Sequence, residues 1–192
     1  MPAHLTRDEL QAGLPEIAAS PVDHGVLRGI VIRPKAGERQ ELQSVDISHT
    51  GGVHGDNWAL GCWKTTKDGR PHPDVQICIM NARAIALIAG ARDNWAPAGD
   101  NLFIDLDLSL ENLPAGQRLA IGSAIIEITD EPHTGCANFV RRYGRDATVF
   151  VNTGVSRHMR LRGIYARVVR DGRVAVGDTV SKVARTFGPD AT

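Results

Sequence analysis

The sequence has no long hydrophobic run and no net charge, and each absence excludes a class of protein. The longest apolar stretches, such as residues 84–91, are far too short to cross a bilayer. The N-terminus shows no basic region followed by an apolar core, so it carries no recognisable secretory signal. A formal net charge of +0 over 192 residues gives no reason to expect attraction to nucleic acid. We therefore expect partners other than a membrane or a nucleic acid.

Cysteine is scarce and scattered. Cys62, Cys78 and Cys136 form neither a CxxC pair nor an even-numbered disulfide framework. No cluster of histidine and cysteine at zinc spacing is present, so a structural zinc site made by the protein alone is not expected. No flavin or iron-sulfur motif is visible either. Unpaired cysteines are typical of a reducing compartment, and we expect a cytoplasmic protein.

What the sequence does contain is a series of short strand-like segments. Thr6 and Glu9 make a capping box, which predicts a helix that ends at Ser20-Pro21 and packs either on the domain or on a partner subunit. Asn81 is the expected N-cap of a second helix over 81–91. Strands are predicted over residues 26–33, 42–47, 75–80, 102–105, 118–121, 124–129, 148–152, 163–170, 173–176 and 179–183. Asp171-Gly172 indicates a hairpin between two of them.

Many short strands, few helices and no alternating βαβ series predict a mainly β fold, a barrel with a few short helices. We expect a helical extension over residues 1–22, one barrel domain over 23–184 and a C-terminal tail over 185–192. A chain of this length is long enough for a single well-buried domain.

Cys136 follows a loop after a predicted strand and precedes the densest run of arginines. A thiol acts as nucleophile or metal ligand only as thiolate, and Arg141, Arg142 and Arg145 could lower its pKa. The alternative is a small buried hydrophobe, but Gly135 and polar neighbours argue against a core position. His133, three residues earlier, could be a proton donor or base, or simply an exposed loop residue.

Positive charge is concentrated in the last third of the chain, where arginines dominate from Phe139 to Arg173. Such a stretch suits a compact anion such as a phosphate, or is a solvated face. Residues 157–162 alternate polar and apolar, so Arg160 and Arg162 are expected on one face of a strand. They are our expected phosphate contacts, unless they only keep an edge strand soluble.

Four further polar residues are candidate binding residues. Asn101 follows a tight turn at a strand start, and His54 and Asp56 lie in a similar turn. Each could reach a pocket, or could cap its own turn. Asn138, two residues after Cys136, could contact a ligand or order the loop.

Several motifs follow one another in a recognisable serial order: Gly99-Asp100-Asn101-Leu102, Leu113-Pro114-Ala115-Gly116, Leu119-Ala120-Ile121-Gly122, the Cys136 loop, Arg162-Gly163-Ile164-Tyr165-Ala166-Arg167-Val168 and Val176-Gly177-Asp178. This order resembles the MOSC domain, named for the C-terminal domain of molybdenum cofactor sulfurases. The match extends from about residue 26 to residue 183 and includes the turn around Asp56. Gly135 stands where the family usually has proline, and Asp100 where it usually has glutamate.

This resemblance implies a β-barrel with one important cysteine, which Cys136 matches. In one implied role its sulfur coordinates the metal of a molybdenum cofactor (molybdopterin), and the enzyme reduces small N-hydroxylated substrates with electrons from a separate redox partner. In another, Cys136 carries a persulfide received from a sulfurtransferase. A third possibility is a cofactor-binding module without chemistry; pyridoxal phosphate binding is also associated with the family. The expected site comprises Cys136 as metal ligand, His133 as catalytic residue, and His54, Asp56, Asn101, Asn138, Arg160 and Arg162 as cofactor contacts.

Overall fold

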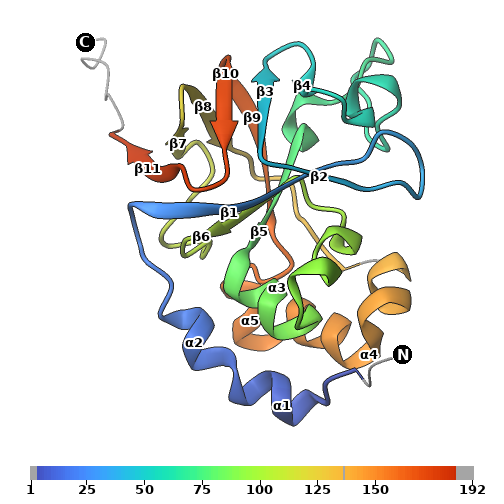
Figure 1. The fold of residues 1–192 in the computed structure, drawn as a ribbon, viewed down its shortest axis with the longest axis vertical. Coiled ribbons are helices and arrows are strands. Elements are labelled where there is room, and N and C mark those ends of the chain that lie inside the picture. Colours follow the sequence, from blue (N-terminus) through green and yellow to red (C-terminus); the bar gives the residue numbers. More distant parts are fainter. Residues whose placement is uncertain (1–3, 136, 185–192) are drawn as a thin grey trace.

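A computed structural model describes residues 4–135 and 137–184 of the chain. Within these residues, seven strands close a barrel in the order β1-β11-β7-β8-β9-β5-β6, and β6 pairs again with β1 (Figure 1). Neighbouring strands are antiparallel except β5 and β6, which are parallel. The strands are β1 (Gly25–Ile32), β5 (Ile77–Asn81), β6 (Leu102–Asp105), β7 (Arg118–Ile121), β8 (Ala124–Ile128), β9 (Ile164–Arg170) and β11 (Thr179–Val183).

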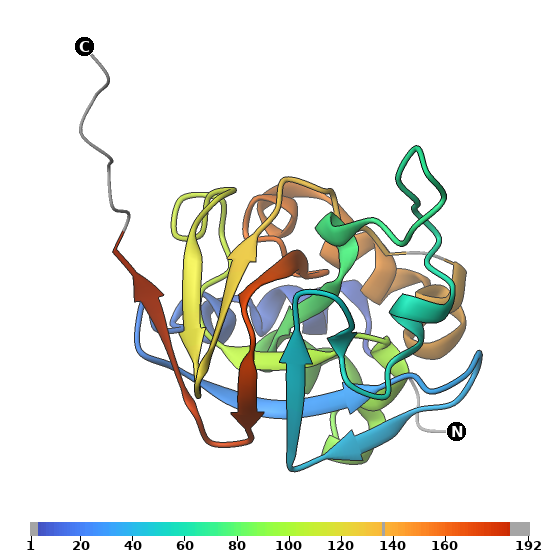
Figure 2. The same cartoon turned by 90° about the horizontal axis from the view of Figure 1, so that it is seen from above.

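Strand β1 closes the barrel because it pairs with a strand on each side. Its start lies beside β11, with Gly25 opposite Val180, and its length runs beside β6, with Ile30 opposite Leu102. In Figure 2 the blue β1 passes across the barrel, and the yellow β7 and β8 lie beside the red β11. Closure leaves few free edges, which removes a common route to aggregation. The interior of the barrel is filled by branched aliphatic side chains, among them Leu27, Ile30, Ile79, Ile104, Leu119, Ile121, Ile126, Ile164, Val168 and Val180.

Five helices gather at one end of the barrel in Figure 1. They are α1 (Arg7–Ala12), α2 (Leu14–Ala18), α3 (Ala82–Ala89), α4 (Ala137–Asn152) and α5 (Gly154–His158). A second apolar core lies between them and the outside of the barrel, and it includes Leu10, Ile17, Val31, Met80, Ile85, Phe103, Phe139 and Phe150. None of the helices in the described ranges is long and apolar enough to cross a membrane.

The N-terminal helices therefore belong to the packing of the domain. Leu10 and Ile17 are buried in the second core, and α1 contacts α4 while α2 contacts α3. The capping box is confirmed, since the Glu9 backbone donates to Thr6 Oγ1 and the Thr6 backbone donates to the Glu9 carboxylate. The sequence left open whether this N-terminal segment packs on the domain or on a partner subunit. In the structure it packs on the domain.

The remaining elements form a smaller sheet and short 3₁₀ turns. Strand β3 (Ser44–Ser48) pairs with β4 (Gly52–Val53) and with β10 (Gly172–Ala175), while β2 (Gln40–Leu42) extends β1. The 3₁₀ turns are η1 (Asn57–Leu60), η2 (Pro73–Val75), η3 (Arg92–Asn94) and η4 (Ala96–Ala98). Several of these short elements surround the site described below.

The mainly β barrel with few short helices is confirmed, but several local predictions were wrong. The segment predicted as one strand over 42–47 is divided between β2 and β3. Residues 148–152 belong to α4, because Phe139, Tyr143, Ala147 and Val151 are buried at helical spacing; Gly144 (φ 86°) kinks the helix and hides this period. Strand β10 pairs with β3 and makes no hairpin with β9. The Asp171 carboxylate instead accepts from the His49 backbone at 2.7 Å, which joins that turn to the end of β3.

Candidate functional site

The segment that leads to Cys136 is anchored at both ends. Residues 129–135, which follow β8, have no regular secondary structure, and α4 begins at Ala137. At the start of this segment Thr129 Oγ1 donates to the Asp74 carbonyl at 2.8 Å, and at its end the Gly135 backbone donates to Asn152 Oδ1 at 2.9 Å. Cys136 lies outside the described residues, so its roles as catalytic residue and metal ligand stay predictions.

A cavity of about 560 Å³ lies against this segment, and Thr134 and Asn138, on either side of Cys136 in sequence, line it. Among its described lining residues there is no aspartate or glutamate. We call it the arginine cavity, because four arginines line it: Arg33, Arg39, Arg142 and Arg162.

Two of the four arginines form ion pairs with buried carboxylates. Arg33 makes a bidentate pair with Asp56, with Nε 2.9 Å from Oδ1 and Nη2 2.7 Å from Oδ2. Arg162 Nη1 lies 3.0 and 2.9 Å from the two oxygens of Asp100, whose side chain is completely buried. Since unpaired charges are rarely buried, each pair allows an arginine to sit under the cavity. The two ion pairs hold the guanidinium groups of Arg33 and Arg162 in fixed positions under the cavity, and we call these two groups its floor.

Asn101 ties this floor to the barrel. Its Oδ1 accepts from the Cys78 backbone at 3.1 Å and from Arg33 Nη2 at 3.2 Å. Its Nδ2 donates to the Val31 carbonyl and to Asp56 Oδ1, each at 3.2 Å. The amide is buried and its hydrogen-bonding capacity is used by the protein. Asn101 and Asp56 thus position Arg33.

The other two arginines have no carboxylate within ion-pair distance in the described structure. Arg39 and Arg142 both approach Gly99, whose left-handed backbone (φ 89°) leaves space beneath them. Arg142 Nη1 donates to the Pro97 carbonyl, and Arg39 Nε is buried without a partner. Burial and the neighbouring cations Arg142 and Arg33 lower the pKa of Arg39. An anion bound here would offset that repulsion.

His133 forms part of the wall of the same cavity. Its ring stacks on Tyr165 with centroids 4.3 Å apart, and its side chain is only 7% exposed. The Nδ1 atom is buried without a hydrogen-bond partner among the described residues and lies 3.7 Å from Asp100 Oδ1. Burial and the cations Arg162 and Arg33 hold the pKa of His133 well below its ordinary value. The imidazole is therefore neutral at neutral pH.

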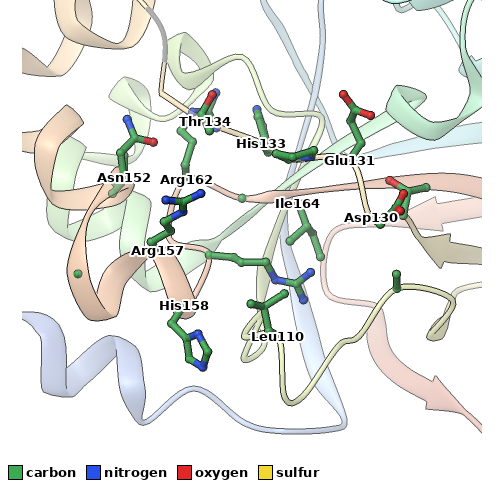
Figure 3. Close-up of a pocket in the computed structure, with 17 residues that line it drawn as sticks. Leu110, Asp130, Glu131, His133, Thr134, Asn152, Arg157, His158, Arg162 and Ile164 are labelled. Atoms are coloured by element: carbon green, nitrogen blue, oxygen red, sulfur yellow. The ribbon is translucent and has the colours of Figure 1, made fainter.

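A second cavity, of about 590 Å³, adjoins the first and is drawn in Figure 3. We call it the Arg157 cavity. His133, Thr134 and Arg162 line both cavities and form the wall between them. In Figure 3, Asn152 and Arg157 lie on one side of this cavity, and Asp130 lies on the other.

Sequence comparison identifies the family. The model of the MOSC domain matches residues 49–181, more than half of the chain. The chain belongs to the MOSC domain family. No curated protein matches it in sequence.

Solved structures share the MOSC fold at low sequence identity. YuaD from Bacillus subtilis is 19% identical, with a TM-score of 0.58 over 84% of this chain and 97% of that one. YiiM from Escherichia coli is 19% identical, with a TM-score of 0.53 over 83% of this chain and 70% of that one. YiiM from Geobacillus stearothermophilus is 14% identical, with a TM-score of 0.53 over 87% and 76%.

The structure brings together some of the predicted residues of this MOSC protein and separates others. Arg162, His133 and Asn138 line the arginine cavity, and Asp56 and Asn101 lie beneath it. His54 is exposed and lines neither cavity. Asn138 is also exposed, and its Oδ1 accepts from Arg141 at 2.7 Å.

The prediction of a strand carrying Arg160 and Arg162 was wrong. Residues 157–158 end α5 and residues 159–162 form a turn before β9, with Arg160 at φ 52°. The polar and apolar alternation that suggested a strand arises instead from this helix end and turn. Arg160 lines the Arg157 cavity and not the arginine cavity, whereas Arg162 lines both.

Several cavity residues, Arg33 among them, escaped the sequence prediction as contacts. Arg142 was expected only as a source of charge near the thiol, and Arg39 stands alone in a turn between β1 and β2 with no motif around it. Cys78 lies on β5 with its sulfur 3.5 Å from Arg33 Nη1, and burial raises the pKa of its thiol. Only the barrel topology brings these residues to one cavity.

Proposed function

We propose that this MOSC protein binds the molybdenum cofactor in the arginine cavity, with Cys136 as metal ligand, and reduces small N-hydroxylated compounds. Electrons come from a separate redox-partner protein. The observation that carries the proposal is a cavity lined by four arginines and no carboxylate among its described residues, next to the sequence neighbours of Cys136. Such a cavity suits an anionic ligand.

The donor set fits a phosphorylated pterin. Arg39 and Arg142 have no carboxylate partner and approach the same glycine, so they are the natural phosphate contacts. Buried polar atoms without partners, Arg39 Nε, Arg162 Nε and His133 Nδ1, are those that a polar ligand would satisfy. A cysteine thiolate suits a metal rich in sulfur ligands. The described residues include no group of three or more histidine, cysteine or acidic side chains that could hold a metal alone.

When bound, the cofactor supplies two-electron reduction chemistry. Conversion of an N–OH group to N–H consumes two electrons and two protons and releases water. His133 is placed to move a proton, because it is neutral, faces both cavities and has a buried Nδ1 without a partner. Arg33 and Arg162 hold positive charge in fixed positions. Their counter-ions Asp56 and Asp100 keep these guanidinium groups oriented.

Metal and pterin analysis tests this proposal directly. We expect protein purified from cells that synthesise the cofactor to contain molybdenum and pterin, and the Cys136→Ser variant to lose the metal while staying folded. Folded wild-type protein without either component would contradict it.

The same preparations distinguish two other functions. A reducible extra sulfur on the Cys136 peptide after treatment with a sulfurtransferase, seen by mass spectrometry without molybdenum, would indicate a persulfide carrier. Full cofactor content and full cellular function in Cys136→Ser would indicate a binding module without chemistry.

A further inference from the structure

The Arg157 cavity is lined by a fixed cation, Arg160, which makes no ion pair with a described residue, although Asp107 and Glu111 lie near enough to raise its pKa. Arg160 Nε donates to the Leu108 carbonyl at 2.6 Å, and its Nη2 donates to the carbonyls of Ser109 and Leu113 at 2.9 and 2.6 Å. Within the described residues its Nη1 has no hydrogen-bond partner, and no carboxylate lies within 4.0 Å of the guanidinium. Burial lowers the pKa of Arg160 to about 10, so it remains charged at neutral pH.

The backbone at this position is also unusual. Arg160 adopts φ 52°, a left-handed conformation that costs a non-glycine residue conformational energy. Gly163 donates its N–H to the Arg160 carbonyl at 2.8 Å and closes the turn. This strained turn therefore holds the Arg160 guanidinium, which makes no ion pair with a described residue, at the wall of the cavity. A partly buried charge of this kind calls for a partner of opposite sign.

Arg157 adds a second free cation. Its side chain is exposed and makes no ion pair or hydrogen bond with any described residue, and it lines the same cavity. His158 is already paired with Glu111, and Glu131 with Lys64. Asp130 is the remaining acid in the lining, and Figure 3 places it on the opposite side from Arg157.

The rest of the cavity can accept an apolar body. Leu110, Val151 and Ile164 contribute aliphatic surface, and a volume of about 590 Å³ falls within the range of pockets that hold small organic molecules. His133 also lines this cavity; its side chain is only 7% exposed, and its Nδ1 has no partner among the described residues. This combination suits a small organic acid that lies with its carboxylate toward the arginines.

We propose that the Arg157 cavity binds a small carboxylate-bearing organic molecule, with its carboxylate held by Arg157 and Arg160. Because His133 and Arg162 separate this cavity from the arginine cavity, the bound molecule lies next to the proposed cofactor site. Its use as the substrate site rests on the proposed function. Binding of the acid itself does not depend on the cofactor.

A matched set of probes tests the proposal by ¹⁹F NMR on the purified full chain. 4-Fluorobenzoate, 4-fluorobenzamide and 4-fluorobenzamidine share one ring and differ in charge. We expect saturable line broadening for the benzoate, with at least tenfold weaker binding of the other two, because charge-assisted hydrogen bonds are the stronger ones. Equal binding of the amide, or no binding of the benzoate, would overturn the proposal.

Variants then locate the bound acid. Arg157→Gln is expected to weaken 4-fluorobenzoate binding about tenfold, whereas Arg145→Gln, an exposed arginine outside both cavities, serves as the matched control. Arg160 is left intact because it anchors the loop at residues 108–113. Loss of binding in Arg39→Gln with full binding in Arg157→Gln would place the acid in the arginine cavity and overturn the proposal. Molybdenum content is measured separately, so failure of the proposed function shows as absent metal and leaves this test unaffected.

Discussion

The backbone N–H of Gly135 donates a 2.9 Å hydrogen bond to the side-chain oxygen of Asn152, which lies at the far end of α4. A Cβ atom at position 135 would lie 2.8 Å from Asn152 Nδ2 and 3.2 Å from Thr148 Cγ2. The MOSC family usually has proline here, which can neither donate this bond nor avoid that contact. Glycine before Cys136 and asparagine at the end of α4 thus form a matched pair that fixes the segment.

The Gly135–Asn152 pair predicts the effect of placing proline, the usual family residue, at position 135. We expect Gly135→Pro to lower the free energy of unfolding by about 1–3 kcal/mol, because Asn152 Oδ1 loses its donor and the ring meets the amide. Gly135→Ala keeps the N–H but makes the same steric contact, so its loss of stability in urea denaturation measures the steric part of the effect. In the double variant Gly135→Pro/Asn152→Ala we expect part of the lost free energy of unfolding to be recovered. A single proline variant as stable as wild type would contradict this account.

Two residues of one turn, His54 and Asp56, are expected to behave differently. Asp56 is buried and holds Arg33 through both oxygens, so Asp56→Ala leaves a nearly buried guanidinium unpaired. Breaking a buried pair costs about 3–5 kcal/mol. His54 is exposed, and His54→Ala should stay within about 0.5 kcal/mol of wild type. Thermal and urea denaturation compare the two variants. Equal stabilities would show that the Arg33–Asp56 pair does not support the floor of the cavity.

The buried His133 predicts how stability depends on pH. Its folded pKa is lowered well below the ordinary value of 6.5 by burial and two arginines, whereas in the unfolded chain it is protonated near that value. Below about pH 6.5 the unfolded state therefore binds an extra proton, and stability falls as pH falls. His133→Phe removes this effect and keeps a ring against Tyr165. From pH 7.5 to 5.5 we expect wild type to lose on the order of 1 kcal/mol relative to the variant. Parallel stability curves would mean that His133 titrates normally in the fold.

The barrel could be predicted because its strands are local patterns. Branched aliphatic residues between glycine and proline turns marked β6 and β11 at their observed bounds, and Asn81 was correctly expected to cap α3. The kinked helix α4 could not be predicted, because Gly144 interrupts the helical period and the β-branched residues Thr148 and Val149 are typical of a strand. The strand propensity of residues 148–152 gave the wrong prediction, because the burial of Phe139 and Phe150 in the second core stabilises a helix there.

The candidate site was predictable in its chemistry and less so in its members. Arg162 and His133 were found because they lie near motifs of the family. Arg39 comes from a turn with no signal of its own, and Arg160 was expected on a strand that does not form. Which arginines keep a free charge depends on buried carboxylates far away in sequence, such as Asp100 beneath Arg162. Only the folded chain shows this pairing.

The two arginines without carboxylate partners give the last prediction, which concerns cofactor content. If Arg39 and Arg142 hold the phosphate of the cofactor, Arg39→Gln and Arg142→Gln should each weaken its binding about tenfold, because a charge-assisted hydrogen bond to phosphate is lost. Neither side chain makes an ion pair with a described acid, since Asp56 and Asp100 pair with Arg33 and Arg162, so both variants should fold with stability near that of wild type. Molybdenum and pterin per protein, measured after dialysis, are compared with those of Arg145→Gln, an exposed arginine of the same helix as Arg142 that lines neither cavity. Undiminished cofactor in both variants would show that the phosphate lies elsewhere.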